Sequence, residues 1–414
     1  MATATLPETA PHIPGRPPTA GVRSPADALP GRIRSVDIMR GIVMVLMAID
    51  HVRVYSGQPA GGPTAGIFFT RWVTHFVAPG FLFLAGTAAF LHGRKLGDTR
   101  ALSRFLLTRG LWLVFLELTF LRLAWTFNTD FANYNLAGVI WMIGWCMVIM
   151  SALVYLPLRW IGAIGIAIIV GHNLADLFQP ALGQWVQGSP VAWLLKISYF
   201  GGQVSLGPGG PPLFILFVIK PWLGTMAAGY AFGSVLTRPF AEWRTFSMRL
   251  GAAMIVGFLL LRALDGYGDP RHWHTGQVPA LFRFLGTSKY PASLLFLLMT
   301  LGPMLLLLPS LEKLRGRFGD ALETFGRVPF FYYMLHIPLI HLSAILISRI
   351  REGRVNPWLF TNHPLAPGPL PDGYQWSLGL LYLDWVVVVV LLYFACRWYA
   401  NVKKGSTNRL FSYL

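Results

Sequence analysis

Long apolar runs alternate with short polar connections along almost the whole chain. Most of the runs reach the roughly 20 residues that a helix needs to cross the hydrocarbon core of a bilayer. The pattern therefore predicts an all-α, polytopic integral membrane protein with about ten transmembrane helices. The expected spans lie at 38–54, 67–91, 102–122, 136–156, 161–178, 213–236, 246–264, 291–309, 327–348 and 376–400.

Two of these runs are less regular than the others. In the first run, ionisable side chains leave only Gly41–Ile49 uncharged. In the run at 213–236, Lys220 directly precedes Pro221, so the helix is expected to begin near Pro221. The clearest run is 136–156, which contains no charged residue.

The two ends of the chain differ from the apolar middle. Residues 1–31 are rich in Pro, Ala, Gly and Thr and lack the apolar stretch of a signal peptide, so we expect a disordered cytoplasmic tail. Residues 32–400 are expected to form the transmembrane domain. Residues 401–414 would then be a short cytoplasmic C-terminal tail.

Composition supports the membrane prediction and argues against a nucleic-acid-binding protein. Apolar residues make up 54% of the chain and charged residues only 12%, about half the share of a soluble domain. The net charge of +17 is spread over short clusters between apolar runs, which is where orientation signals lie. We therefore expect a lipid bilayer as the partner and no nucleic acid.

The basic clusters also predict the orientation of the chain. Every second connection is rich in Lys and Arg, whereas the loop at 179–212 carries only Lys196, so both termini are expected on the cytoplasmic side. Arg349, Arg351 and Arg354 fall on the opposite side and are exceptions. The clusters expected inside comprise Arg32 and Arg34; Arg94, Lys95, Arg100 and Arg104; Arg159; Arg238 and Arg244; Lys313, Arg315 and Arg317; and Lys403 and Lys404.

Most histidines fall in the outer half of this topology, and three of them are candidates for catalysis. His51 ends the first span, His75 begins the second, and His336 lies near the middle of the ninth. Ionisable groups at membrane depth are costly and usually functional, which favours an outward-opening cavity that handles protons. The alternative is that these imidazoles are hydrogen-bonded to backbone carbonyls within the packed protein.

Charged neighbours of these histidines are further candidates. Asp50 is grouped with the catalytic candidates, although at helical spacing it is better placed to pair with Arg53 than with His51. Arg71 shares one helix face with His75 and is positioned to hold a carboxylate or phosphate of an acceptor. We therefore list Arg53 and Arg71 as candidate substrate-binding residues.

A separate charged group stands at the cytoplasmic mouth of the first helix. Arg34, Asp37 and Arg40 are candidates for binding the phosphates of a cytosolic donor such as coenzyme A, although topology alone also explains basic residues there. No metal site is expected, because His272 and His274 lack further ligands at a recognised spacing. Phosphate-binding loops, nucleophile elbows and paired-cysteine motifs are absent from the sequence.

Six segments between about 32 and 345 carry a pattern that belongs to a known family. They are Arg32–Gly41, Met44–Arg53, Phe76–Gly86, Pro221–Gly224, Lys289–Pro291 and Phe325–Pro329. Together they span most of the expected folded chain, and they resemble the heparan-α-glucosaminide N-acetyltransferase catalytic-domain family in its bacterial form.

The resemblance implies a membrane acetyltransferase that moves acetyl from cytosolic acetyl-CoA to a glucosamine on the far side. It places His51 where the animal enzyme has a catalytic asparagine. It places Gly62 where that enzyme has its essential histidine, so His51 or His75 would have to take over the role of base.

The sequence as a whole favours an acyltransferase in a bacterial inner membrane, with several passes through the bilayer. The donor substrate would be acetyl-CoA or another acyl-CoA, the acceptor an amino sugar, glycan or other small molecule outside, and the general base a histidine. A homo-oligomer is compatible with this prediction. The alternatives are a proton-coupled transporter or flippase that uses the outer histidines, and a non-catalytic scaffold.

Overall fold

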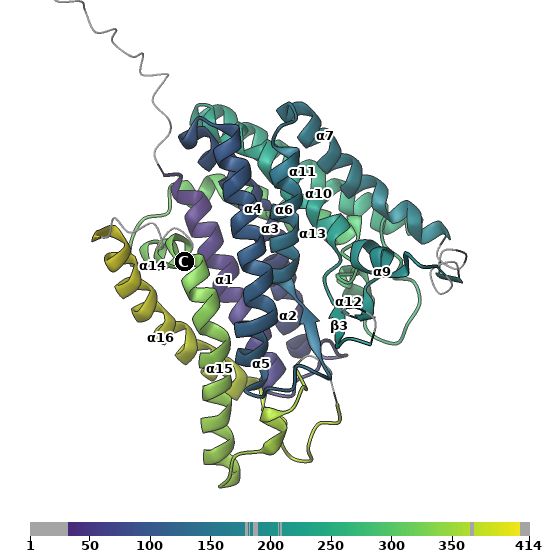
Figure 1. Ribbon diagram of the computed structural model, residues 1–414, viewed down its shortest axis with the longest axis vertical. Coiled ribbons are helices and arrows are strands. Elements are labelled where there is room, and N and C mark those ends of the chain that lie inside the picture. The colour runs from purple at the N-terminus through teal and green to yellow at the C-terminus, as the bar shows by residue number, and fades with distance from the viewer. Residues whose placement is uncertain are drawn as a thin grey trace, which may run out of the picture. The chain divides into compact units, whose positions relative to one another are not determined.

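Helices dominate the computed structural model, which describes residues 32–178, 181, 183–184, 189–205, 207, 209–364 and 368–405. The expected tail at 1–31 and most of the one at 401–414 lie outside these residues. The α-helices are α1 (Arg34–Tyr55), α2 (Ala65–Trp72), α3 (Val77–Leu96), α4 (Thr99–Leu116), α5 (Arg122–Thr126), α6 (Val139–Leu153), α7 (Leu158–Gly171), α9 (Ala192–Leu195), α10 (Ile219–Gly233), α11 (Phe240–Leu264), α12 (Ala280–Leu285), α13 (Leu294–Glu312), α14 (Arg317–Arg327), α15 (Pro329–Glu352) and α16 (Leu378–Gly405) (Figure 1). Short 3₁₀ or π segments are η2 (Val73–Phe76), η3 (Glu117–Leu121), η4 (His172–Phe178), η5 (Lys196–Phe200), η6 (Val235–Thr237) and η7 (Pro357–Phe360).

Six helical segments in the described part of the chain are long and apolar enough to cross a membrane, and they confirm six of the expected spans. The chain is therefore an α-helical, multi-pass membrane protein. The segments are Ala65–Leu96, Leu158–Phe178, Phe240–Leu264, Leu294–Glu312, Pro329–Glu352 and Leu378–Lys403. The helix Pro329–Glu352 continues through Pro338.

The other expected spans do not meet this criterion, each for a physical reason. Helix α1 has charged side chains near both ends, and α4 carries three arginines. Helices α6 and α10 contain only 15 residues each, which corresponds to about 22 Å of helix. The number of about ten spans and the orientation remain predictions.

A small sheet shortens α6 and α10. Strand β1 (Asn135–Ala137) and strand β3 (Pro212–Ile215) occupy the beginnings of the two apolar runs that were expected to be entirely helical. The order is β1-β3-β2, with β1 parallel to β3 and with β2 (Gly202–Ser205) antiparallel to β3. Three short strands thus interrupt an otherwise helical fold.

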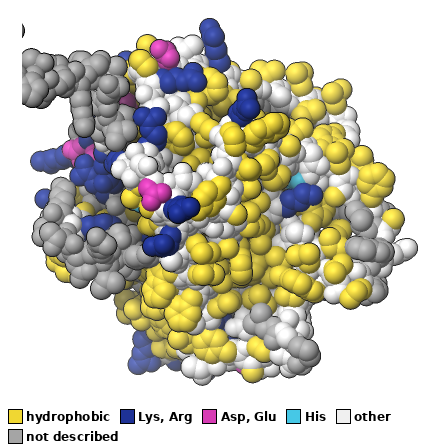
Figure 2. Space-filling model, turned by 45° about the horizontal axis from the view of Figure 1, so that its top comes forward, with side chains coloured by type: hydrophobic (Ala, Val, Ile, Leu, Met, Phe, Trp, Pro, Cys, Tyr) yellow, Lys and Arg dark blue, Asp and Glu magenta, His cyan; other side chains and the backbone are white. Residues whose placement is uncertain are grey.

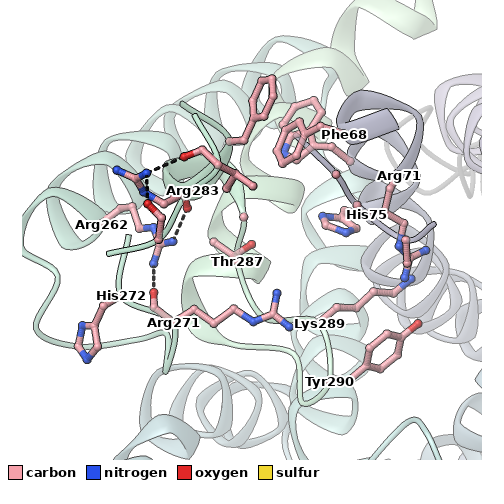
Figure 3. A pocket seen from close by; sticks show the side chains of 18 of the residues that line it. Phe68, Arg71, His75, Arg262, Arg271, His272, Arg283, Thr287, Lys289 and Tyr290 are labelled. Atoms are coloured by element: carbon pink, nitrogen blue, oxygen red, sulfur yellow. Dashed lines mark hydrogen bonds between the residues drawn. The ribbon is translucent and has the colours of Figure 1, made fainter. Parts of the chain in front are cut away.

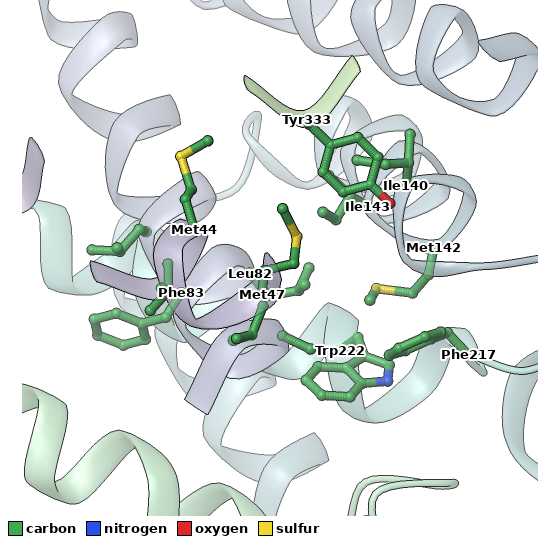
Figure 4. Close-up of a cluster of buried hydrophobic side chains, with 14 of the residues drawn as sticks. Met44, Met47, Leu82, Phe83, Ile140, Met142, Ile143, Phe217, Trp222 and Tyr333 are labelled. Atoms are coloured by element: carbon green, nitrogen blue, oxygen red, sulfur yellow. The ribbon is translucent and has the colours of Figure 1, made fainter. Parts of the chain in front are cut away.

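Helix α1 lies among other helices and packs against α3, α13, α14, α15 and α16. Its approach to α14 is closest at glycines: a Cβ at Gly326 would lie 1.8 Å from the Asp37 carbonyl oxygen, and one at Gly41 would lie 2.0 Å from that of Leu322. Only glycine permits this contact. Around α1 the buried core includes Met44, Met47 and Trp222 (Figure 4).

The outer surface is largely apolar, as expected for helices that face lipid. Large exposed side chains include Phe115, Trp160 and Phe394. Figure 2 shows apolar side chains over much of one face, with Lys and Arg concentrated towards one part of it. An apolar exterior is stable only in lipid, which agrees with the assignment to a membrane.

Candidate functional site

Two histidines from distant parts of the chain meet inside the helical domain. Nδ1 of His51, near the C-terminal end of α1, lies 2.7 Å from Nε2 of His336 in α15. Their rings are stacked, with centroids 4.9 Å apart. His336 is completely buried, and its Nδ1 lies 2.6 Å from the carbonyl oxygen of Tyr333.

These hydrogen bonds determine where the protons of the two neutral rings lie. The Tyr333 carbonyl can only accept, so Nδ1 of His336 donates to it and Nε2 of His336 is left as an acceptor. Nδ1 of His51 must then donate to Nε2 of His336. In His51 the unprotonated nitrogen is therefore Nε2, which has no hydrogen-bond partner among the described residues. An imidazole in this form can accept a proton.

The Asp50 carboxylate pairs with two guanidinium groups and forms no hydrogen bond with the His51 ring. It accepts a hydrogen bond from Nε of Arg53 at 2.9 Å, the pairing that helical spacing predicts. It also forms an ion pair with Arg71 of α2. This second contact fixes the start of the Ala65–Leu96 segment against the end of α1.

Lys289 adds another positive charge beside this cluster. It precedes α13, is 8% exposed, and lies with Nζ 5.3 Å from the ring centre of Tyr290 and 5.7 Å from that of Phe217. Burial lowers the pKa of Lys289. Burial would raise the pKa of Tyr290, but Lys289 and Arg71 outweigh that effect and lower it.

Three cavities lie around these residues. The basic cavity, of about 460 Å³, is lined by His75, Arg71, Lys289 and Tyr290, and also by Gly62 (Figure 3). The central cavity, of about 190 Å³, is lined by His51 and Asp50, and it shares Arg71, Lys289 and Tyr290 with the basic cavity. His51 and His75 therefore line adjoining cavities.

The third space, the apolar cavity, has a volume of about 440 Å³ and shares Tyr333 and Val139 with the central cavity. Most of its walls are apolar, and Arg40, His92 and Arg109 are its polar exceptions. Arg109 lies over the rings of Phe105 and Phe330, at 5.9 and 5.8 Å. The three cavities are therefore neighbours in a series, and His51 lines the middle one.

Glu117 lies between the apolar helices and the central cavity. One of its oxygens accepts hydrogen bonds from the backbone N–H groups of Ile140 and Trp141, at 3.0 and 3.2 Å. These N–H groups belong to the first turn of α6, where a negative charge is favourable. Glu117 therefore anchors α6 and also lines the central cavity.

The candidate donor-binding residues at the beginning of α1 contact α14. Arg34 forms ion pairs with Asp320, at 2.6 Å, and with Glu323. Arg40 donates to Asp37 at 3.2 Å and to the carbonyl oxygen of Gly326 at 2.9 Å. Of the three, Arg40 lines the apolar cavity.

Other histidines are hydrogen-bonded to backbone carbonyls within the packed protein, which was the alternative to a catalytic role. His172 and His341 are buried, and their ring nitrogens lie within 3.2 Å of backbone carbonyl oxygens, so they serve the packing of the fold. His272 lies 3.3 Å from Asp265 at the surface. No group of side chains suited to a metal ion is found among the described residues.

Sequence reasoning alone missed the pairing of His51 with His336 and gave no role to Lys289 or Arg271. The two histidines are 285 positions apart, so no local spacing could connect them. For Lys289 a signal was available: a lysine directly before an apolar run, next to Tyr290, within one of the segments that resemble the family.

Comparison with family models gives a match over more than half of the chain. A family model described as heparan-α-glucosaminide N-acetyltransferase, catalytic, matches residues 32–262. The matched region includes α1, the Ala65–Leu96 segment and the walls of the apolar cavity up to α6. No curated protein matches the chain.

Proposed function

The chain belongs to the heparan-α-glucosaminide N-acetyltransferase catalytic family, and from this premise we propose that it moves an acetyl or other acyl group across the membrane. The donor would be cytosolic acyl-CoA, and the acceptor an amino sugar or another nucleophile on the extracytoplasmic side. One observation carries the proposal: three neighbouring cavities share wall residues, and His51 lines the middle one. Such a series can bring two substrates from opposite sides to one base.

The apolar cavity is the proposed donor site. Its walls suit the pantetheine arm of acetyl-CoA, while Arg40 and Arg109 would hold phosphates. Arg34 and Asp37 would act at the entrance, on the first turn of α1. Acetyl-CoA is a substrate here, and the proposed reaction requires no metal.

The acceptor would enter through the basic cavity, beside His75 and Arg71. Arg53 and Arg71 would act through Asp50, which both contact, and so hold the wall between the basic and central cavities. His75 is the second candidate for the base, because it lines the same cavity as Gly62.

The proposed chemistry is general-base catalysis by His51. Its Nε2 takes a proton from the acceptor's amine or hydroxyl as that group attacks the thioester carbonyl. A C–N or C–O bond forms, the C–S bond breaks, and the proton passes to the leaving thiolate of CoA. His336 is a positioning residue, because its hydrogen bond keeps Nε2 of His51 unprotonated.

We further propose about ten spans with both termini in the cytoplasm of a bacterial cell. In this arrangement α1, α4, α6 and α10 cross the membrane although they are short or charged. Surrounding helices, and not lipid, would shield their polar groups, as the packing of α1 among neighbouring helices permits.

The experiment is an acyl-transfer assay with purified protein in detergent. Radiolabelled acetyl-CoA is supplied with and without amino-sugar acceptors, and free CoA thiol and labelled product are measured. We expect CoA release that depends on the acceptor and is lost in H51A. If no acceptor promotes CoA release while proteoliposomes show proton-coupled solute movement, the transporter is the better description.

A further inference from the structure

The basic cavity has a marked excess of positive charge. Its described walls include five cationic side chains and no carboxylate; the five are Arg71, Arg262, Arg271, Arg283 and Lys289. Aromatic side chains such as Phe68 and Trp72 form much of the remaining wall. Because cations repel one another and are costly to bury, such a set requires an explanation.

Two of the five cationic side chains, both arginines, are hydrogen-bonded to backbone carbonyl groups. Arg262 donates to the carbonyl oxygens of Phe284, Arg271 and Arg283, at 2.9, 2.6 and 2.8 Å. Arg283 donates to those of Trp273, Gly276 and Val278, at 2.8, 2.8 and 2.6 Å. Both arginines hold the loop between α11 and α13 in shape, and this role accounts for them.

The remaining three are not accounted for in this way. Arg71 shares the carboxylate of Asp50 with Arg53. The guanidinium of Arg271, which is exposed, and the ammonium of Lys289, which is buried, form no ion pair with any described residue. Figure 3 shows Arg271, Lys289 and Arg71 following one another along one wall of the cavity.

Unpartnered polar atoms belong to two side chains that line the same cavity. Nδ1 of His75 and Nε1 of Trp72 are buried and have no hydrogen-bond partner among the described residues, and both side chains line the cavity. Buried polar atoms are normally paired. An anionic ligand would supply acceptors for these atoms and balance the charge of Lys289 and Arg271 together.

We propose that the basic cavity is an anion-binding subsite, in which Lys289 and Arg271 hold a carboxylate, phosphate or sulfate group of the acceptor. This inference rests on the proposed function and names the acceptor as an anionic molecule. The subsite adjoins the central cavity, so an amine or hydroxyl on the same molecule can reach His51.

The first test measures anion binding apart from catalysis. Thermal unfolding of the purified protein is followed during titration with sulfate at constant ionic strength. We expect sulfate to stabilise the wild type, with an apparent Kd for sulfate that is roughly tenfold or more higher in K289Q and R271Q. The apparent Kd should be unchanged in R244Q, which alters an exposed arginine outside the cavity. Equal sulfate responses in all four proteins would overturn the subsite.

The second test identifies the molecule that carries the anion. Glucosamine and glucosamine 6-phosphate are compared as acceptors in the acetyl-CoA assay, in nanodiscs of neutral or of anionic lipid. Preference for the phosphorylated sugar, lost in K289Q, supports a soluble acceptor. Label transferred to an anionic lipid would instead assign the same subsite to a headgroup.

The two proposals fail in different ways. Acyl transfer that shows no preference for the phosphorylated sugar over glucosamine and is insensitive to K289Q would overturn the subsite and leave the enzyme intact. Sulfate binding that depends on Lys289, without any CoA release, would leave the subsite and overturn the acyltransferase. If CoA displaces sulfate and sugar phosphates do not, the cavity holds the donor and its assignment to the acceptor is wrong.

Discussion

Nδ1 of His51 lies 2.7 Å from Nε2 of His336, and this contact joins α1 to α15. Because His336 is itself held by the Tyr333 carbonyl oxygen at 2.6 Å, the tautomer of His51 depends on a residue that lines none of the three cavities. A base whose tautomer is set by a buried partner is ready to accept a proton without rearrangement.

Loss of either histidine should lower turnover, but to different degrees. H51A removes the proposed base, and we expect kcat to fall by about 10²–10⁴-fold. H336L removes only the acceptor that orients His51, so kcat should fall by about 10²-fold or less while KM for acetyl-CoA is unchanged. Initial rates in the acetyl-CoA assay measure both effects.

The control for His336 keeps an acceptor in place. In H336Q the amide oxygen can occupy the position of Nε2, so we expect most of the activity lost in H336L to return. If H336L and H336Q are equally impaired but fold normally, His336 acts through packing and not through the tautomer. Wild-type rates in H51A would make His75 the first candidate.

The orientation can be tested with single cysteines at exposed positions. A60C and A132C should react with an impermeant thiol reagent added to intact cells, whereas T99C and K313C should react only after permeabilisation. The native Cys146 and Cys396 are buried, so the background should be low. The reverse labelling pattern would place the basic cavity on the cytoplasmic side and contradict the proposed path of the acceptor.

The contact between α1 and α14 gives a prediction about stability. G326A places a Cβ 1.8 Å from the Asp37 carbonyl oxygen, and we expect destabilisation of about 1–3 kcal/mol or more from overpacking. G171A is the matched control, because no atom lies within 4 Å of the added Cβ and alanine favours helix. Thermal unfolding in detergent should show a lower midpoint only for G326A.

Anion binding in the basic cavity should depend on pH through Lys289. Burial lowers the pKa of this lysine, while Tyr290, Arg71 and Asp50 also act on it, so its charge is lost at a lower pH than that of an ordinary lysine, near 10.4. Stabilisation by sulfate, which stays fully ionised, should therefore weaken as the pH rises through this lowered value. In K289R it should persist to higher pH, because a guanidinium remains charged. Identical pH curves for the wild type and K289R would exclude Lys289 as the titrating group.

Much of the fold follows from the sequence because lipid imposes a simple rule. A run of about 20 apolar residues has few alternatives to a spanning helix, and the runs at 291–309 and 376–400 correspond to α13 and α16. The strands β1 and β3 could not be predicted in the same way. Their residues are as apolar as the helices that follow, and a short buried strand has no periodicity that distinguishes it.

In the site too, local contacts could be predicted from the sequence and contacts between separate helices could not. The Asp50–Arg53 pair is local and follows from helical spacing. The contacts of Asp50 with Arg71 and of His51 with His336 depend on how separate helices pack, which one sequence does not specify. The excess positive charge around Lys289 likewise depends on how the loop before α13 packs beside α1 and α2.

The donor site gives the last prediction. Acetyl-CoA or CoA should stabilise the detergent-solubilised protein, by about 2.7 kcal/mol at a concentration one hundred times its Kd, if it binds only the native state. Arg109 and Arg40 line the apolar cavity, so R109Q and R40Q should weaken this stabilisation. R238Q, at an exposed position outside the cavity, should not. R40Q also removes bonds to Asp37 and Gly326, and R109Q removes the contacts with Phe105 and Phe330, so the lower stability of each variant without ligand must be subtracted. Undiminished stabilisation by CoA in both variants would place the donor site elsewhere. No stabilisation of the wild type at millimolar CoA would contradict acyl-CoA as the donor.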